Sequence, residues 1–312
     1  MTTSFSERVL AVSVVVPAFN CENTIERAVI SLLNQDISAN YEIVVVDDGS
    51  TDNTKAVVES INSSKVRFVR QENMGASGAR RKGVIESRGE YVCFLDSDDI
   101  AVPCYLSSLK NALDENSSAI LAYGIVADMQ GKRLVSEQLP VTEENGILSD
   151  PLVALLVTGC FTASMNLMTT RTIALFASED RAKIYASNDY DFCLRASTQG
   201  PFVFANEITI LIERFESGIS SRLSHLQAGF AVISCYEAYK LSERRDKEIK
   251  KALRNRIKLL WHSAFIQLIM KGEYIIALKV LKIASIYLSP SDVKFLYWAI
   301  LHERKKNRGD IK

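Results

Sequence analysis

The sequence predicts an α/β fold with a mixed, mainly parallel sheet covered by helices on both faces, followed by a helical C-terminal region. Short apolar runs alternate with segments of helical periodicity through the first third of the 312 residues, which is typical of βαβ units. Polar residues gather where these runs end. Beyond about residue 225 the helical periodicity continues with few turn signals, which indicates a separate set of helices.

Four apolar runs are predicted strands, because they are rich in β-branched residues or lack the alternation of a half-exposed strand. The first, VSVVVP, is closed by Pro17, and the others are Glu42–Val46, KVRFV and EYVCFL. The stretches between them repeat apolar residues at helical spacing. The predicted helices begin at Thr24, span Lys55–Ile61, and lie within GASGARRKGVIES.

The segment EYVCFLDSDD raises a chemical question, because three carboxylates follow a buried strand at once. Asp96, Asp98 and Asp99 would repel one another unless a positive charge lay among them. A divalent cation held through oxygen ligands is one answer. The alternative is a helix cap, in which Asp98 or Asp99 accepts backbone N–H bonds before Pro103.

Polar side chains follow three of the four predicted strands. Ligands of open parallel sheets bind outside the carboxyl ends of the strands, so we expect these loops to meet in one crevice. Capping does not require acids at the end of one strand after another, which favours ligand binding. The loop residues are Pro17, Phe19 and Asn20, then Asp47, Asp48, Gly49 and Ser50, and finally Asp96, Ser97 and Asp98.

The composition excludes several classes of function. The formal net charge is zero, which argues against nucleic-acid binding. Neither GxGxxG nor GxxxxGK[ST] occurs, so neither a dinucleotide fold nor a P-loop is indicated. The six cysteines form no CxxC pair, which is typical of thiols in a reducing compartment. The N-terminal segment lacks the features of a signal peptide, and we expect a cytoplasmic protein.

Residues 151–170 contain no charged side chain, so a membrane span is one interpretation of them. Polar residues such as Thr158, Ser164 and Asn166 make a poor span on an insertion scale. We therefore predict a buried helix followed by a buried strand.

Four motifs resemble the inverting glycosyltransferases of family 2, which have the Rossmann-like GT-A fold. They are VVVPAFNCENTIERAVISLLNQ, YEIVVVDDGSTDNT, NMGASGARRKGVIESRGEYVCFLDSDD and SNDYDFCLRA, and together they cover about residues 10–220. The resemblance implies a catalytic domain over residues 1–224, with a nucleotide-binding half at about 10–100 and an acceptor half at about 101–224. A nucleotide-sugar donor, most often a UDP-sugar, would lie across the strand ends.

The resemblance also assigns the nucleotide site. Asp48 would hydrogen-bond the uracil ring, whose N3–H suits a carboxylate acceptor. Pro17, Phe19 and Asn20 would frame the same ring, with Phe19 as part of an apolar wall. The residues themselves are equally compatible with an Asx turn at Asp47 and Asp48, and Asp47 is expected to be no more than that.

Asp96-Ser97-Asp98 matches the DXD motif of the family, which answers the question raised by the acidic segment. Asp98 would coordinate Mg²⁺ or Mn²⁺, and Asp96 would hold the ribose or a metal-bound water. The cation would neutralise charge on the departing nucleoside diphosphate. Arg80 stands at the arginine position near the nucleotide. Residue 81, commonly Asn, is Arg81 here, so the two arginines could divide one role.

Asp189 in SNDYDFCLRA matches the base of the family, which deprotonates the acceptor hydroxyl. The preceding acid of the family is Asn188 in this chain. A plain helix start, with Asp189 and Asp191 favouring the helix dipole, is compatible with the same residues.

The segment ERFESGIS resembles the closing element R-x-H-x-x-S-x-S of the family. Arg214 and Ser220 keep their places there and would contact the diphosphate of the donor. The histidine position is Glu216, which becomes a further candidate metal ligand.

Residues 225–312 are predicted to form a basic helical subdomain. From Cys235 to residue 312 there are 18 lysines and arginines against 8 aspartates and glutamates. Packing on the catalytic domain, docking on an anionic membrane surface and self-association are three alternatives for these helices.

These features predict a metal-dependent inverting glycosyltransferase, with Mn²⁺ or Mg²⁺ as cofactor, of the bacterial polysaccharide-biosynthesis type. It would move a single hexosyl or N-acetylhexosaminyl unit to a glycan or lipid-linked glycan acceptor in cell-surface polysaccharide synthesis. Its location would be cytoplasmic or peripheral at the inner face of the plasma membrane, without nucleic acid. The alternatives are a catalytically impaired nucleotide-sugar-binding protein, and a nucleotidyltransferase, which should carry a Gly-rich basic loop after the first strand.

Overall fold

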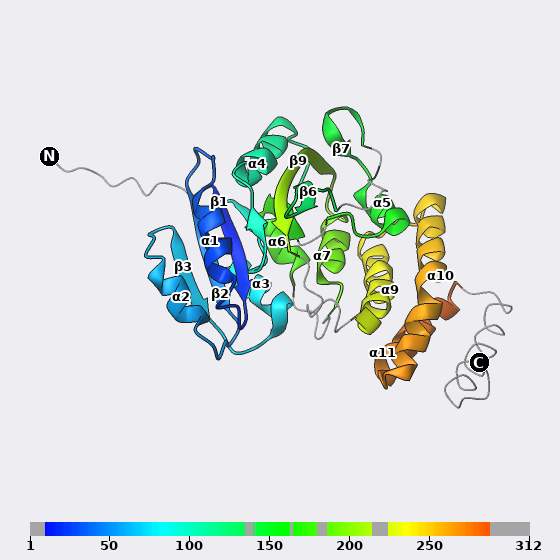
Figure 1. The fold of residues 1–312 in the computed structure, drawn as a ribbon. Helices are drawn as coiled ribbons and strands as arrows, with labels where there is room; N and C mark the ends of the chain where they lie inside the picture. The colour runs from blue at the N-terminus through cyan, green and yellow to red at the C-terminus, as the bar shows by residue number, and fades with distance from the viewer. Residues whose placement is uncertain are drawn as a thin grey trace. The chain divides into compact units, whose positions relative to one another are not determined.

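A computed structural model describes residues 10–134, 140, 142–162, 165–179, 186–213 and 224–287. The chain forms two compact units, whose elements are labelled in Figure 1. Among the described residues, the first unit holds those of 10–179 and 188–213, and the second holds 186–187 and 224–287.

A mixed sheet forms the centre of the first unit (Figure 1). Within the described residues it has nine strands, eight of them in the order β3-β2-β1-β4-β8-β6-β9-β5, and β7 pairs with β9. The pairs among β1 to β4 are parallel, β8 is antiparallel to both its neighbours, and β6 is parallel to β9. The strands are β1 (Val12–Ala18), β2 (Tyr41–Asp47), β3 (Val66–Arg70), β4 (Tyr91–Phe94), β5 (Ile100–Ala101), β6 (Leu121–Asp128), β7 (Ile147–Leu148), β8 (Leu167–Thr170) and β9 (Phe202–Ile212).

Helices cover both faces of this sheet. On one face, α1, α2 and α4 share a hydrophobic core with even-numbered β1 residues such as Val14 and Val16. On the other face α3 lies against β1, and α6 and α7 follow beside it. An added Cβ on Gly83 of α3 would lie 2.2 Å from Cγ1 of Val15, so this crossing requires glycine. The helices are α1 (Ile25–Leu33), α2 (Thr54–Ser60), α3 (Gly75–Glu86), α4 (Tyr105–Glu115), η1 (Glu144–Gly146), α5 (Pro151–Thr158), α6 (Arg171–Ala177) and α7 (Asn188–Ala196).

The four predicted strands and the helices between them are confirmed by β1 to β4 and α1 to α3. Residues 151–170 contain the expected buried helix, α5, and the expected buried strand, β8. Strands β5, β6, β7 and β9 were not predicted from the sequence. Among the described residues, no helix has both the length and the apolar character needed to cross a membrane.

Pro17 does not close the first strand as expected, because β1 continues to Ala18. The Val15 carbonyl accepts the Leu95 amide, and the Ala18 carbonyl accepts the Asp48 amide. Since backbone groups alternate sides along a strand, the position of Pro17 faces β4 just beyond the last pairing of β1 with β4. The missing N–H therefore removes none of the hydrogen bonds of the β1–β4 ladder, which ends at Val15 and Phe94.

The second unit is helical, as predicted for this part of the chain. Its described helices α9 (Ser224–Leu241), α10 (Lys247–Met270) and α11 (Tyr274–Ser285) each pack against the other two. Asp246 caps α10 by accepting the Ile249 amide at 3.0 Å. The break between α9 and α10 that this cap marks was not predicted from the sequence. Gly229 of α9 lets the helices approach, because an added Cβ would lie 2.8 Å from Leu268 Cδ1.

Candidate active site

The loops after β1 and β2 are joined by hydrogen bonds at the carboxyl ends of the strands. The Asn20 amide donates to Ser50 Oγ at 2.9 Å, and Asn20 Oδ1 accepts the Thr51 amide at 2.8 Å. Asn20 has a φ of 48°, a value that asparagine tolerates better than most residues. Phe19, 45% exposed, presents an apolar surface beside this junction. Phe19 and Asn20, two of the predicted nucleotide-site residues, therefore lie at the junction where hydrogen bonds join the two loops.

Asp47 and Asp48 are both buried but hold different partners. Asp47 Oδ1 accepts the amide of Ser50, three residues on, at 3.0 Å, and Asp47 Oδ2 lies 3.0 Å from Arg70 Nη1. Asp47 therefore holds the turn after β2, although an Asx turn would use the amide two residues on. Asp48 Oδ1 accepts from Met74 N at 2.8 Å and from Gln71 Nε2 at 2.6 Å. One oxygen of Asp48 thus fixes the segment after β3.

The acidic loop after β4 is held at both ends by side chains from other elements. Tyr105 of α4 donates its hydroxyl to the Phe94 carbonyl at 2.7 Å, where β4 ends. Arg27 of α1 donates Nη2 to the Asp98 carbonyl at 2.9 Å, and its Nη1 lies 2.9 Å from Glu213 Oε2. Arg27 and Glu213 were missed by the sequence analysis, and nothing in the local sequence pairs two residues so far apart.

The helix-cap alternative for the acidic loop is wrong. Helix α4 begins at Tyr105, its N-cap is Cys104, and no side chain caps it. Asp99 instead donates its backbone amide to the Asp96 carbonyl, which closes a turn before β5.

Arg80 joins the acidic loop to the predicted base. Its guanidinium donates Nη2 to Asp96 Oδ1 at 2.6 Å, and its Nη1 lies 3.7 Å from Asp189 Oδ1. The Arg80 side chain is only 10% exposed, whereas Asp96 and Asp189 keep 28% and 32% exposure. A buried cation therefore lies between two carboxylates that solvent and substrate can still reach.

Electrostatics within the cluster follow from this arrangement. Burial by itself would lower the pKa of Arg80, but the charges of Asp96, Asp189 and Asp99 outweigh it and raise that pKa. Asp98 is exposed as a residue, yet its carboxylate loses hydration and lies near Asp96. These two effects, in that order, raise the pKa of Asp98. The loop thus carries more negative charge than its arginines neutralise.

Helix α7 is anchored so that Asp189, in its first turn, faces this cluster. Tyr190 donates its hydroxyl to the Leu155 carbonyl at 2.7 Å, and Arg195 Nη2 donates to the Phe176 carbonyl at 2.9 Å. The Phe192 ring packs edge-on against Phe94, with centroids 5.5 Å apart. Arg81, by contrast, donates to the Ser178 carbonyl at 3.1 Å, and a division of one role between the two arginines stays a prediction.

The donor set of the acidic loop suits a hard divalent cation. Asp96, which is half-buried, and Asp98, which is exposed, offer carboxylate oxygens in the loop after β4, and Mg²⁺ is commonly held by one or two carboxylates together with substrate phosphates. Within the residues that the structure describes, no group of three His, Cys, Asp or Glu could hold a metal alone. Arg214, Glu216 and Ser220 lie outside the described residues, so their assignments remain predictions.

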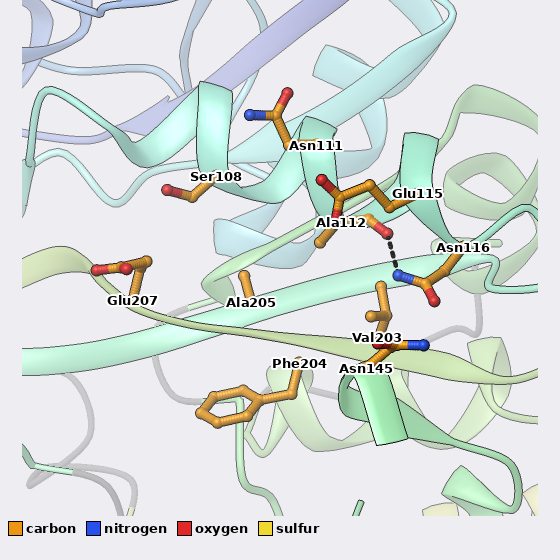
Figure 2. A pocket seen from close by; sticks show the side chains of 10 residues that line it. All are labelled: Ser108, Asn111, Ala112, Glu115, Asn116, Asn145, Val203, Phe204, Ala205 and Glu207. Carbon is orange, nitrogen blue, oxygen red and sulfur yellow. Dashed lines mark hydrogen bonds between the residues drawn. The ribbon is translucent and has the colours of Figure 1, made fainter. Parts of the chain in front are cut away.

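A shallow pocket of about 210 Å³ lies elsewhere in the first unit, between α4, β9 and η1 (Figure 2). Its lining contains the carboxylates Glu115 and Glu207 and no arginine or lysine. The side chains of Asn111 and Asn145 also line it. Since a diphosphate needs positive partners, this pocket does not suit the charged part of a nucleotide-sugar.

A family model described as Glycosyl transferase family 2 matches residues 13–168, which is half of the chain. The chain belongs to glycosyltransferase family 2. The matched segment contains the joined loops, Arg80 and the acidic loop, and it ends before Asp189.

Two relatives of this family-2 chain are named as enzymes of glycan synthesis. A chondroitin synthase of Escherichia coli is 30% identical over 210 residues, which are 65% of this chain and 29% of the relative. The UDP-Glc:alpha-D-GlcNAc-diphosphoundecaprenol beta-1,3-glucosyltransferase WfgD of Escherichia coli is 40% identical over 90 residues, 28% of this chain and 35% of the relative. The aligned part thus spans about a third of each relative.

Solved structures confirm the fold of the family-2 chain. The structure of S. aureus TarS 1-349 in complex with UDP-GlcNAc matches with a TM-score of 0.58 at 16% identity, covering 89% of this chain and 91% of the other. The predicted GT-A fold is thereby confirmed.

Proposed function

We propose that this family-2 chain is a metal-dependent inverting glycosyltransferase that moves one sugar from a UDP-sugar to a glycan or lipid-linked glycan acceptor in cell-surface polysaccharide synthesis. The observation that carries the proposal is the Arg80 bridge, which holds a donor-side carboxylate, Asp96, and the expected base, Asp189, in one cluster. The names of the relatives, a chondroitin synthase and an undecaprenol-linked glucosyltransferase, support the acceptor class. The UDP-GlcNAc complex of TarS supports the donor class.

The predicted nucleotide-site residues in the loops after β1 and β2 would bind the donor. Asp48 would accept the uracil N3–H through Oδ2, because its Oδ1 already holds Gln71 and Met74. Phe19 would flank the ring, and Pro17 and Asn20 would shape the backbone below it. The pairing of β1 with β4 ends at Val15 and Phe94, and ligands of open α/β sheets bind outside such strand ends.

The diphosphate would be held at the acidic loop. Asp98 and Asp96 would hold a Mg²⁺ or Mn²⁺ ion, which would supply positive charge to the leaving diphosphate when bound. Arg80 keeps Asp96 in place and adds its own positive charge. Glu216, Arg214 and Ser220 would complete this side of the site, as the resemblance implies.

The sugar is transferred by direct displacement. The acceptor oxygen forms its bond to the anomeric carbon as the bond to the β-phosphate oxygen breaks, and that oxygen keeps the electron pair and leaves with UDP. Asp189 accepts the proton of the acceptor hydroxyl. Attack on the face opposite the leaving group inverts the anomeric configuration.

The test measures UDP release from a panel of UDP-sugars with Mn²⁺ or Mg²⁺, for the native protein, Asp98→Ala and Asp189→Asn. We expect one donor to be hydrolysed slowly, with loss of release on chelation and in both variants. Asp191→Asn is the matched control for Asp189→Asn, because both acids lie in the first turn of α7.

Three outcomes would contradict this assignment. Release unaffected by Asp189→Asn, like that of the control, would remove Asp189 as the base. UDP binding with no turnover of any donor, even with candidate glycan acceptors, would favour the nucleotide-sugar-binding protein. The absence of UDP binding would contradict the assignment of a UDP-sugar as the donor.

A further inference from the structure

Helix α11 is apolar on two sides. Its buried side packs inside the second unit through Ala277, Val280 and Ala284. The opposite side is exposed and carries four large apolar side chains. They are Tyr274 at 61% exposure, Ile275 at 75%, Leu278 at 64% and Ile286 at 58%.

At 3.6 residues per turn, Tyr274, Leu278, Ile275 and the C-cap residue Ile286 fall within an arc of about 120°, so they lie on one side of the helix. Lys279 and Lys282 are exposed on that same face. Helix α11 contains no aspartate or glutamate. The four apolar residues and these two lysines are here called the α11 face.

The described part of the second unit has an excess of basic residues. Residues 224–287 contain 12 lysines and arginines against 5 aspartates and glutamates. Several basic residues of α10, among them Lys250, Lys251 and Arg254, are exposed. A helix face that combines large exposed apolar side chains with lysines and lacks acids suits the interface of an anionic bilayer, because the apolar atoms can insert while the long lysine side chains reach the headgroups.

We propose that the α11 face docks on an anionic lipid surface. Tyr274, Ile275, Leu278 and Ile286 enter the boundary between headgroups and acyl chains, and Lys279 and Lys282 extend to the lipid phosphates. This inference deepens the proposed function. It rests on that function only in one respect, because a lipid-linked acceptor would give the enzyme a reason to bind a membrane.

Charge favours lipid over a second copy of the chain. A two-fold contact through the α11 face would place Lys279 and Lys282 of one copy close to the same lysines of the other. Like charges brought together in a desolvated contact oppose association. An anionic bilayer instead pairs every one of these lysines with a phosphate.

The experiment is flotation of the full chain with vesicles of phosphatidylcholine alone and of phosphatidylcholine mixed with phosphatidylglycerol. We expect binding to the mixed vesicles that weakens as salt is raised. The double variant Ile275→Ser/Leu278→Ser should lower vesicle partition by about tenfold or more, since it removes two inserted aliphatic side chains. Lys279→Gln and Lys282→Gln should each lower it by about fivefold.

The matched control is Ile30→Ser, which removes an exposed aliphatic side chain from α1 in the first unit. Its partition should equal that of the native protein. Absence of binding to the mixed vesicles, or binding unchanged in both the apolar and the lysine variants, would overturn the proposal. A vesicle-free oligomer that dissociates in the apolar double variant would overturn it in favour of a second copy.

The two proposals fail separately. UDP release measured without vesicles tests the enzyme alone. Normal release without vesicle binding would remove only the α11 docking surface. Vesicle binding that depends on the α11 face, in a protein that turns over no donor, would support docking and remove only the proposed activity.

Discussion

Replacement of Arg80 by methionine tests the electrostatic centre of the site. Methionine keeps the apolar stem of the side chain and removes its charge. In the native cluster the guanidinium lies 2.6 Å from Asp96 and 3.7 Å from Asp189. With an effective dielectric constant of about 20, these separations correspond to Coulomb energies of about 6 and 4.5 kcal/mol.

The net cost is smaller than these gross energies. Asp96 and Asp189 are 28% and 32% exposed, so water rehydrates them when the cation is removed, and the desolvation cost of Arg80 itself is recovered. Breaking a buried ion pair from one side costs about 3–5 kcal/mol, and the partial exposure reduces this to about 2–3 kcal/mol. Arg80→Met should therefore lower the free energy of unfolding of the first unit by about 2–3 kcal/mol.

The assay is urea denaturation followed by circular dichroism, with UDP release measured in parallel. Arg81→Met is the matched control, since within the described residues the Arg81 guanidinium makes one hydrogen bond, to a carbonyl, and its loss should cost only about 1 kcal/mol. The double variant Arg80→Met/Asp96→Asn should recover part of the lost stability, because it removes one uncompensated charge. Native stability in Arg80→Met, or a double variant no more stable than the single one, would refute the reasoning.

Three further substitutions test how the site is held. Arg27→Met should weaken Mn²⁺ binding in the presence of UDP by about tenfold or more, because the acidic loop loses the hydrogen bond to its Asp98 carbonyl. Calorimetry measures this affinity, and Arg27→Lys should recover part of it. An unchanged affinity in Arg27→Met would contradict the role of Arg27 in holding the loop. Gly83→Ala should cost about 1–3 kcal/mol in urea unfolding, since its Cβ meets Val15, and native stability would contradict that crossing. Tyr105→Phe should cost a similar 1–3 kcal/mol, roughly the penalty for leaving the Phe94 carbonyl unpaired, and a loss below about 0.5 kcal/mol would contradict that hydrogen bond.

Local pattern was sufficient for the first half of the sheet. The runs that became β1, β2 and β4 are predominantly apolar and almost wholly buried, because helices cover both faces of a parallel sheet. Strand β9 carries several half-buried or exposed residues and has irregular register with β6, so it lacks that signal. The break between α9 and α10 was missed because a cap of one aspartate leaves only a weak mark on the sequence.

The sequence by itself determined which residues could carry the chemistry. Asp48, Asp96 and Asp98 follow predicted strands, and a strand end is a local feature that places a side chain at the edge of the sheet. Only the tertiary structure decided how those residues are held. Arg27 reaches Glu213 and the acidic loop, and Arg80 rather than Arg81 turns toward Asp189, because such ion pairs depend on how distant segments cross. Those crossings are set by packing between helices and sheet, which no window of the sequence contains.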